Sequence, residues 1–488
     1  MPKLRITGDA GEITAAPGAV LSDVLRQAGY APDSPCGGQG SCGKCKVLAD
    51  GAEVLACKTR VERDMQITLP GKAVAQILQS GIETRAELDP VQAGYLLALD
   101  IGTTSVVCFL LDGKTGRELT GSSMQNPQAA YGADVISRIR AALDGAMERL
   151  TSLIRDGVTA LIQTVCAEAG ISPEQIGVVS VVGNPAMQQL FLGISPENLA
   201  AVPFAPVLTR AKTVPCGQVL PICPKAQLLV VPDISGYIGA DTMGCVLSAQ
   251  VYQKEEITLL VDIGTNGEMV LGNREGLIAC STAAGPALEG ANIRFGMRGR
   301  TGAIDHVWLE EGKLRYSVIG GGEAQGICGS GLLDAVAVGL RTGLLNRRGR
   351  IQNEDHVFYL TKQIYLTQED IRQVQLAKGA ICAGIRMMAK QLGLQMCDID
   401  KVYLAGAFGT FLDPESACRI GLLPEELRKK IRPIGNAAGS GAKMLACDRK
   451  LLPLTQTLAE KIEVLELAGL PDFPGTFAKA MLFREETP

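Results

Sequence analysis

The stretch "LLALDIGTTSVVCFLLD" at residues 96–112 recurs in a second form as "TLLVDIGTNGEMVLGN" at residues 258–273. Both copies contain an apolar run that ends in Asp-Ile-Gly-Thr and is followed by a second apolar run. The matching flanks favour a duplicated strand-rich unit over a chance match of four residues. Strands alternating with helices from residue 96 onward indicate α/β architecture. The repeat therefore predicts two related lobes that face each other across a cleft.

Each copy also has the chemistry of a phosphate-binding turn. A glycine turn after a strand presents consecutive backbone N–H groups to phosphate oxygens and lets them approach closely. The hydroxyls of Thr103, Thr104 and Thr265 can add hydrogen bonds, and Asp100 and Asp262 can hold Mg²⁺ through water. A single turn of this kind also fits an ordinary strand-to-turn junction. Two copies on one cleft predict a nucleotide site.

Two further glycine-rich segments lie in the second half of the chain. "VYLAGAFGTFLDP" (402–414) is typical of a strand that enters a glycine turn, and we expect it to close over an adenine. "GNAAGSGAKML" (435–445) is a turn of small residues that leads into a helix. Tight helix packing and ligand contact explain this second segment equally well.

The N-terminal part carries a different chemistry, with four cysteines in "SPCGGQGSCGKCKVLADGAEVLACKT" (34–59). Their spacing, Cys36-x5-Cys42-x2-Cys45-x11-Cys57, approximates that of plant-type ferredoxins and predicts a 2Fe–2S cluster with these four ligands. The interspersed glycines let the backbone bend around inorganic sulfide. Zinc is the alternative for a Cys-x2-Cys pair, but zinc ribbons use two such pairs and only one is present. A disulfide framework is disfavoured because no secretory signal is apparent.

The elements predicted around the cysteines follow the order of a β-grasp ferredoxin. We expect strands at 4–7 and 12–15, a helix at 20–29 that stops at Gly29, and further strands at 46–49, 53–57 and 65–69. The predicted organisation of the whole chain is a ferredoxin-like domain at 1–69, a linker with a short helix at 70–95, and an ATPase domain at 96–488. The two lobes of the ATPase domain are expected to begin near residues 96 and 258.

Composition excludes several classes of function. A net charge of −4 and an aromatic content of 4% over 488 residues argue against nucleic-acid binding. No apolar run approaches the roughly 20 residues of a membrane-spanning helix, so we expect a cytoplasmic protein that does not bind membranes. The two histidines, His306 and His356, exclude a histidine-rich metal site and are expected to be structural or exposed. The eleven cysteines outside the cluster motif are expected to be small buried residues.

Together these motifs resemble the superfamily of acetate and sugar kinases, heat-shock cognate proteins and actin, called ASKHA. A ferredoxin-like unit followed by an ASKHA unit more narrowly resembles the reductive activators of corrinoid proteins, over nearly the whole chain. One departure is Pro185, which follows Asn184 where the family usually has a hydroxyl residue. The resemblance also rests on "VVGNPAMQQLFLG" (181–193), "PDISGYIGAD" (232–241), "ACSTAAGPALEGANIRFGMRGRTGAI" (279–304), "GICGSGLLDAVA" (326–337) and "EDIRQVQLAKGAI" (369–381).

The resemblance implies a fold, a reaction and partners. The fold would be a β-grasp ferredoxin domain followed by a two-lobed ASKHA ATPase. Members use ATP and Mg²⁺ to drive one electron from the 2Fe–2S cluster to the cobalt(II) of a corrinoid protein, which regenerates cobalt(I) for methyl transfer. The implied partners are the corrinoid protein of a methyltransferase system, an upstream low-potential electron donor and, by analogy, a second copy of the chain.

The resemblance also maps nucleotide-contacting residues onto this sequence. The catalytic aspartates would be Asp100 and Asp262. The remaining nucleotide contacts would be Gly102, Thr103, Thr104, Gly264, Thr265, Asn266, Gly267, Gly285, Glu289, Gly406, Ala407, Phe408 and Gly409.

Three other functions remain open from the sequence. One is an ATP-dependent electron donor for another low-potential reductase or dehydratase, for which Cys280 lies near the "AAG" segment as a cluster ligand does in dehydratase activators. Another is a redox-sensing small-molecule kinase, whose base would have to be Asp233, Asp241 or Glu268. The third is a redox sensor or scaffold without enzymatic activity.

Overall fold

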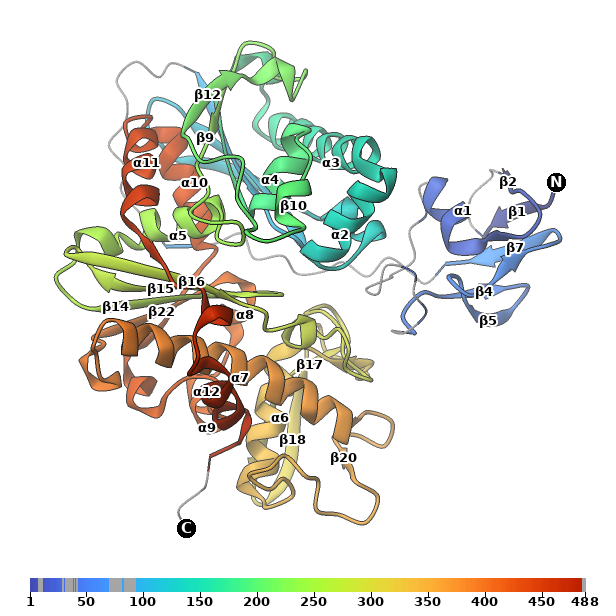
Figure 1. The fold of residues 1–488 in the computed structure, drawn as a ribbon. Helices are drawn as coiled ribbons and strands as arrows, with labels where there is room; N and C mark the ends of the chain where they lie inside the picture. The colour runs from blue at the N-terminus through green and yellow to red at the C-terminus, as the bar shows by residue number, and fades with distance from the viewer. Residues whose placement is uncertain are drawn as a thin grey trace.

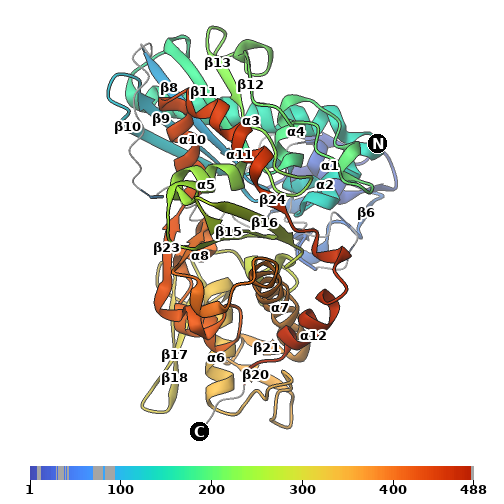
Figure 2. The same cartoon turned by 60° about the vertical axis from the view of Figure 1, so that its left-hand side comes forward.

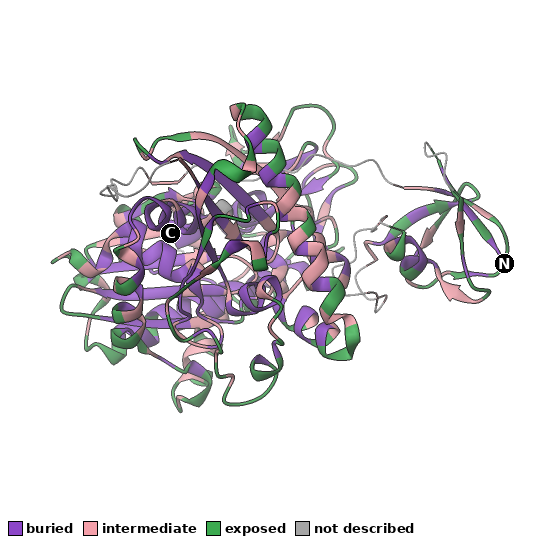
Figure 3. Ribbon diagram, turned by 90° about the horizontal axis from the view of Figure 1, so that it is seen from above, coloured by how far each residue is buried: buried purple, intermediate pink, exposed green. Residues whose placement is uncertain are grey.

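The computed structural model describes residues 1–7, 12–28, 30, 38, 40, 43–69, 81–82 and 94–484, with only the backbone at Ala407. Residues 1–69, which we call the cysteine unit, stand to one side of a larger body (Figures 1 and 3). The buried residues of the body gather in its central strands, and the cysteine unit has a core of its own.

The cysteine unit is a small mixed sheet packed on one helix. Strands β1 (Lys3–Ile6) and β4 (Lys46–Ala49) alternate exposed and buried residues, so one face of the sheet packs against α1 (Leu21–Gln27). The strand order is β2-β1-β7-β4-β5, with β1 parallel to β7. The predicted strand, strand, helix, strand order is confirmed, while Gly29 lies outside the described residues. The other strands are β2 (Glu12–Thr14), β5 (Ala52–Leu55), β7 (Met65–Thr68), β3 (Ala19–Val20) and β6 (Arg60–Val61).

The first half of the body, residues 94–253, is built on a six-stranded sheet and is called the first lobe. Its strand order is β10-β9-β8-β11-β13-β12. The central strand β8 (Tyr95–Ile101) is buried along most of its length, as its continuous apolar run predicts. Its neighbours are β9 (Ser105–Asp112), β10 (Glu118–Gln125), β11 (Ile176–Gly183), β12 (Lys212–Pro215) and β13 (Gln227–Val230). Four helices accompany this sheet, namely α2 (Val135–Ala141), α3 (Met147–Ala169), α4 (Pro185–Leu192) and α5 (Ala240–Ala249).

Residues 258–484, called the second lobe, repeat the same topology. Strands β14 (Thr258–Ile263), β15 (Gly267–Asn273) and β16 (Gly276–Thr282) form an antiparallel meander, as β8, β9 and β10 do. On the other side of β14 lie two parallel strands, β22 (Lys401–Ala405) and β23 (Ile431–Gly435), matching β11 and β13. The duplication predicted from two short motifs therefore extends over five strands of each sheet.

The second lobe carries additional elements. A three-stranded sheet contains β17 (Ala303–Glu310), β18 (Lys313–Val318) and β19 (Gly326–Ile327), and β20 (Val357–Tyr359) pairs with β21 (Tyr365–Thr367). Strand β24 (Glu463–Val464) joins the edge of the main sheet beside β16. The helices are α6 (Gly329–Arg341), α7 (Gln368–Gln391), α8 (Gly406–Phe411), α9 (Pro414–Arg419), α10 (Ala437–Cys447), α11 (Leu451–Lys461) and α12 (Phe473–Met481).

The two lobes meet through α5 and α10, whose contact depends on glycine. A Cβ at Gly441 would lie 2.1 Å from the Gly244 carbonyl oxygen, and one at Gly244 would lie 2.8 Å from the Ala438 oxygen. Only glycine allows these two helix backbones to approach so closely. Figure 2 shows α5 between the two main sheets. The "GNAAGSGAKML" segment thus serves tight helix packing, one of its two predicted roles.

Most of the predicted linker lies outside the described residues, including its predicted short helix. Gly81 pairs with Gly435 in an isolated bridge, and the Ser440 hydroxyl donates to the Ile82 carbonyl oxygen over 3.1 Å. This part of the segment is therefore fixed to the start of α10. Among the residues that the structure describes, no helix has the length and apolar character needed to cross a bilayer.

Candidate functional site

Both predicted turns occur where two strands of a hairpin meet. Asp100 pairs with Val107 across the first hairpin, and Asp262 pairs with Glu268 across the second. The Gly102 N–H donates to the Ser105 carbonyl oxygen over 2.9 Å and closes the first turn. In the second turn the Gly264 N–H donates to the Asn266 carbonyl oxygen over 2.9 Å. The same local sequence therefore gives a tight turn twice, although the second turn is one residue shorter, because Ile101 pairs with Val106 and Ile263 pairs with Gly267.

The carboxylate of Glu289 joins the two turns. Glu289 ends the short 3-10 helix at Pro286–Glu289. Its Oε2 accepts from the Thr104 hydroxyl over 2.9 Å, and its Oε1 accepts from the Thr265 hydroxyl over 3.1 Å. One residue thus contacts the predicted phosphate-binding hydroxyls of both lobes. The family resemblance implied a nucleotide contact for Glu289 but gave no signal for this bridge.

Each aspartate faces the helix that the opposite lobe contributes to the interface. Asn436 at the start of α10 donates its amide N–H to Asp100 Oδ2 over 2.9 Å. On the other side, the Cys245 thiol of α5 lies 3.8 Å from Asp262 Oδ2. The two turns are therefore connected crosswise, each to a helix from the other lobe.

The region around the two turns is strongly acidic, and its carboxyl groups are partly buried. Burial raises the pKa of Asp100 to about 7, with the charge of Asp262 adding to the effect and the Asn436 hydrogen bond opposing it. Burial also raises the pKa of Asp241 on α5 to about 7 and that of Asp262 to about 6. Burial, together with the charges of Asp241 and Asp262, raises the pKa of Glu268 well above its usual value. A divalent cation would relieve this repulsion, so the residues present fit the predicted Mg²⁺.

Asp233 lies before α5 and is the most poorly satisfied of these acids. Both of its carboxyl oxygens are buried and lack a hydrogen-bond partner. Burial raises its pKa well above the usual value, and the charge of Asp241 acts in the same direction. The fold thus brings together Asp233, Asp241 and Glu268. Their surroundings do not identify one of them as a catalytic base.

Two residues that the sequence analysis did not assign hold the first turn in place. The buried guanidinium of Arg138 donates to the Thr103 carbonyl oxygen over 2.5 Å and to the Gly132 carbonyl oxygen over 3.0 Å. The Asn184 amide donates to the Thr103 hydroxyl over 2.9 Å. Asn184 also caps α4, where Pro185 fits the first helical position because no backbone donor is needed there. Pro185 is therefore compatible with the cap.

The segment predicted to close over an adenine forms a strand and a short helix. Strand β22 ends at Ala405, and α8 begins directly at Gly406. Gly406 has a φ of +81°, and a Cβ there would lie 2.7 Å from Asp262 Oδ1. Phe408 packs against the core of the second lobe, near Gly329. Gly406 is therefore next to the second turn, while adenine contact by Gly406–Gly409 stays a prediction.

The other predicted glycines differ in what surrounds them. Gly267 is buried, and a Cβ there would lie 2.9 Å from the Thr282 hydroxyl, so close packing explains this glycine. Gly409 likewise packs against Leu404 of the preceding strand. Gly285 has a φ of +77° with open space where a side chain would project. Of these glycines, Gly285 has room for a ligand to approach.

The predicted cluster ligands are only partly within the described residues. Cys36 and Cys42 lie outside them, whereas the Cys45 and Cys57 sulfurs lie 3.2 Å apart. Gly38, Gly40 and Gly43 all have positive φ, as a backbone that bends around a cofactor requires. Within the described part of the chain no group of three metal-ligating side chains is found. The described thiol pair and glycines fit two of the four ligands of the predicted cluster.

Comparison with known proteins places the chain in a family. The family model for the RACo middle region matches residues 95–254, and the model for the C-terminal domain of RACo, the ASKHA domain, matches residues 256–488. The corrinoid activation enzyme RamQ of Eubacterium limosum is 31% identical over 579 aligned residues, which cover 97% of each chain. The chain belongs to the RACo family of reductive activators of corrinoid proteins. This confirms the resemblance inferred from the motifs.

Two further relatives support membership of the RACo family. A [Co(II) methylated amine-specific corrinoid protein] reductase of Methanosarcina barkeri is 28% identical over 401 residues, covering 75% of this chain and 73% of the relative. A solved structure of a reductive activator for corrinoid, iron–sulfur protein matches with a TM-score of 0.74 and 29% identity. That match covers 99% of this chain and 98% of the other. The predicted ASKHA-type C-terminal part and mixed α/β structure are thus confirmed.

In this RACo family member, Cys280 is poorly placed to hold a cluster shared between subunits. Cys280 is fully buried in β16, and its sulfur lies 3.2 Å from that of Met388. Burial raises the pKa of its thiol, which disfavours the thiolate that a metal would need. The structure therefore disfavours a role for Cys280 like that of a dehydratase activator's cluster ligand.

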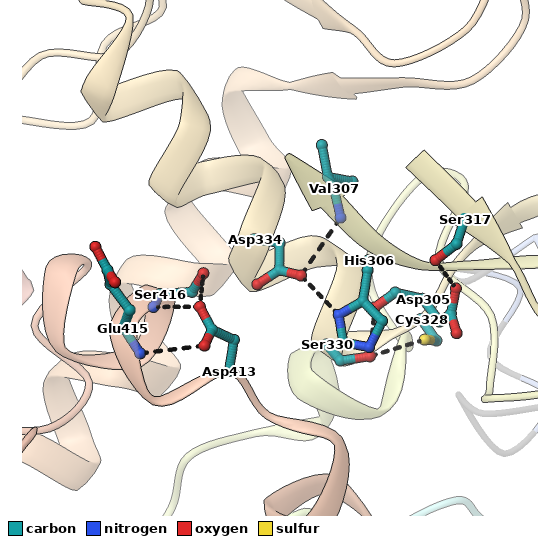
Figure 4. Close-up of polar contacts among 10 residues, drawn as sticks. All are labelled: Asp305, His306, Val307, Ser317, Cys328, Ser330, Asp334, Asp413, Glu415 and Ser416. Atoms are coloured by element: carbon teal, nitrogen blue, oxygen red, sulfur yellow. Dashed lines mark hydrogen bonds and ion pairs between the residues drawn. The ribbon is translucent and has the colours of Figure 1, made fainter. Parts of the chain in front are cut away.

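The two histidines of this RACo family member both have structural partners. His306 Nδ1 lies 3.0 Å from Oδ2 of the buried Asp334, and His356 Nδ1 lies 3.0 Å from the Ile351 carbonyl oxygen. Figure 4 shows His306 and Asp334 facing each other, near the N-terminal cap of α9 formed by Asp413. They line a pocket of about 610 Å³ between β17, α6 and α9. The prediction that the histidines are structural or exposed fits these contacts.

Proposed function

We propose that this protein is an ATP-dependent activase that reduces the cobalt(II) of a corrinoid protein to cobalt(I). The electron would come from a 2Fe–2S cluster held by Cys36, Cys42, Cys45 and Cys57 in a β-grasp ferredoxin domain at 1–69. ATP and Mg²⁺ would bind the ATPase domain at 96–488, with 70–95 as the linker. The names of two relatives support a corrinoid protein as the electron acceptor. One relative is a corrinoid activation enzyme, and the other is a reductase of a Co(II) corrinoid protein.

The observation that carries the proposal is that Glu289 contacts both aspartate turns at one acidic site. Asp100 and Asp262 would hold Mg²⁺ through water, and the Thr104 and Thr265 hydroxyls would turn to the phosphates. The backbone N–H groups of the two turns would receive the remaining phosphate oxygens. The glycines that the family resemblance assigns to the nucleotide site are part of the same proposal. They are Gly102, Gly264, Gly267, Gly285, Gly406 and Gly409.

ATP is needed in this proposal because the electron moves energetically uphill. A plant-type cluster supplies one electron at roughly −400 mV, and corrinoid cobalt(II) is harder to reduce. Each ~59 mV of difference costs a factor of about ten for one electron. Shifting a two-state equilibrium from 1:99 to 99:1 requires about 5.5 kcal/mol of differential binding. Closure of the two lobes on ATP would supply this free energy by changing how the corrinoid protein is bound.

The proposal is tested with anaerobically purified full-length protein. The measurements are iron and sulfide content, and the absorbance change of a cobalt(II) corrinoid protein on reduction, with and without ATP, while a low-potential chemical reductant supplies electrons to the cluster in both cases. Cobalt(I) should form only with ATP, and the variant Cys57→Ser should lose it. Cys397→Ser, which alters an exposed cysteine of the second lobe, is the matched control. Zinc in place of iron at the four thiols, or equal reduction without ATP, would refute the proposal.

A further inference from the structure

The cysteine unit touches the body through a residue that neighbours a predicted cluster ligand. The ammonium group of Lys44, next to Cys45, donates to the carbonyl oxygens of Ile293 over 3.3 Å and Gly296 over 2.8 Å. Both acceptors belong to the second lobe. Lys44 is partly buried, so the contact is not a loose surface contact. A charged donor bound to two carbonyl groups is among the stronger kinds of protein hydrogen bond.

The acceptor loop at residues 290–297 begins directly after Glu289. A Cβ at Gly290 would lie 2.4 Å from the Met297 carbonyl oxygen, so the two ends of this loop are in close contact. The loop also forms hydrogen bonds within its own lobe, from the Arg294 N–H to Asp370 Oδ1 over 2.8 Å and from the Met297 N–H to the Ile327 carbonyl oxygen over 2.9 Å, so a shift of the loop would carry these contacts with it or break them. Because the two ends of the loop are in contact, we expect a displacement of Glu289 to reach Ile293 and Gly296 through the loop.

The other end of this connection lies at the predicted phosphate site. Glu289 accepts hydrogen bonds from both Thr104 and Thr265. A threonine hydroxyl has one hydrogen to donate, so a phosphate oxygen that receives it must take the place of the carboxylate. The carboxylate and the phosphate also repel each other as anions. Phosphate binding would therefore displace Glu289 and the loop that follows it.

A second contact links the cysteine unit to the first lobe. The guanidinium carbon of Arg26 in α1 lies 5.2 Å from the centre of the Tyr131 ring, and Figure 1 shows this unit beside α2. Tyr131 precedes Gly132, whose carbonyl oxygen accepts from Arg138, and Arg138 in turn holds Thr103. The cysteine unit thus contacts each lobe close to the residues that support its phosphate turn.

From these contacts we propose that Glu289, the 290–297 loop and Lys44 form a lever that couples nucleotide binding to the position of Cys45. The inference rests on the proposed function and deepens it by assigning positioning residues. Phosphate at Thr104 and Thr265 releases Glu289, the loop shifts, and Lys44 carries that shift to Cys45. These contacts of Lys44 are to backbone carbonyl oxygens of the second lobe, so we assign it a positioning role.

The first experiment separates nucleotide hydrolysis from electron delivery in the full-length protein with its cluster. Lys44→Met removes the donor at nearly constant length, and Lys44→Arg keeps a cationic donor. Lys46→Met is the matched control, because Lys46 pairs with Glu53 inside the cysteine unit. In Lys44→Met, ATP hydrolysis should continue while ATP-stimulated cobalt(I) formation falls by about tenfold, within the usual range of coupling between sites. Lys44→Arg should restore much of the stimulation.

The second experiment needs no corrinoid protein. Hydrogen exchange is measured in peptides covering 286–297 and 43–57, with and without MgATP. In the unaltered protein both peptides should change on addition of MgATP. In Lys44→Met only 286–297 should change, and Glu289→Ala should show raised exchange in 286–297 already without nucleotide.

The outcomes distinguish the lever from the proposed function. If MgATP alters exchange at the two turns but not at 43–57 in the unaltered protein, the lever is refuted and the proposed function survives. Stimulation in Lys44→Met equal to that in Lys46→Met would also refute the lever. If MgATP alters hydrogen exchange nowhere in residues 94–484, both the proposed function and the lever are refuted.

Discussion

The two Asp-Ile-Gly-Thr turns both close strand hairpins, but they lie in different electrostatic surroundings. Asp100 faces a neutral amide, because Asn436 at the start of α10 donates a hydrogen bond to it. Asp262 faces α5, where Asp241 has a pKa that burial and the charge of Asp262 together raise to about 7. The two turns thus share a sequence motif, but they differ by one residue in length and in the helix that each aspartate faces. The Asp262 side concentrates negative charge and is the stronger candidate for the cation.

The largest effect should come from removing the two turn carboxylates one at a time. Asp262→Asn should lower Mg²⁺-dependent ATP hydrolysis by about 100-fold and Asp100→Asn by about 10-fold, the range seen when groups that hold a metal through an intervening ligand are lost. The reason is that the charge of Asp262 acts on Asp100, Asp241 and Glu268 together. Steady-state hydrolysis at saturating Mg²⁺ measures the difference.

The control for this pair is Glu275→Gln, which changes an exposed acid in the turn between β15 and β16. It should leave ATP hydrolysis as it is. Equal losses at the two aspartates, or a greater loss in Asp100→Asn, would show that the surroundings of the turns do not decide their roles.

The second prediction concerns Asp241 and the pH. Its pKa is about 7 in the folded protein against 3.8 when exposed, so its contribution to stability is complete below about pH 4 and is lost as pH rises through about 7. Without Mg²⁺, Asp241→Asn should raise the free energy of unfolding at pH 8 by about 2 kcal/mol and change it little at pH 4. Thermal unfolding at both pH values in the presence of a chelator is the measurement.

Added Mg²⁺ should reverse the gain in stability that Asp241→Asn shows at pH 8. Cation binding requires ionised carboxylates, so Mg²⁺ should stabilise the unaltered protein more at pH 8 than at pH 6. Asp241→Asn should reduce that stabilisation. A gain in stability for Asp241→Asn that is the same at pH 4 and pH 8 would mean that packing, and not charge, explains it.

The third prediction makes the Asp100 side resemble the Asp262 side. Asn436→Asp keeps the cap of α10, because aspartate caps helices as well as asparagine does. It replaces the amide donor at Asp100 by a second carboxyl group. We expect a loss of about 1 kcal/mol in the free energy of unfolding at pH 8, measured by thermal unfolding, and almost none at pH 4. A loss that does not depend on pH would contradict the electrostatic explanation.

Sequence alone predicted those parts of the site that are encoded locally. The apolar runs before Asp100 and Asp262 are long enough to define buried strands, and Asp-Ile-Gly-Thr encodes the turn that follows. The order of elements around the cysteines could also be predicted from the sequence. The reason is that the alternation of exposed and buried residues in a strand depends on the residues of that strand itself. Family resemblance added Glu289, which no periodicity would have indicated.

The remaining features depend on residues that are distant in the chain. Asn436 meets Asp100 only because two helices cross at Gly244 and Gly441. Arg138 supports Thr103 from the interior of the first lobe, and its sequence context resembles any amphipathic helix. The prediction of an adenine turn at 402–414 did not anticipate the helix α8, because glycine-rich junctions give little local information about which element follows.

The smallest effect should come from the thiol that stands beside Asp262. Burial and the nearby carboxylates raise the pKa of Cys245 well above its usual value, so it remains a thiol and is a weak donor to Asp262. Cys245→Ala should change ATP hydrolysis by less than about twofold and shift its pH profile slightly upward, since Asp262 loses a hydrogen bond that favours its charged form. Cys447→Ala, at a buried cysteine on α10 away from either aspartate, is the control. If Cys245→Ala abolishes hydrolysis, Asp262 depends on the thiol as Asp100 depends on Asn436, and the difference between the two turns disappears.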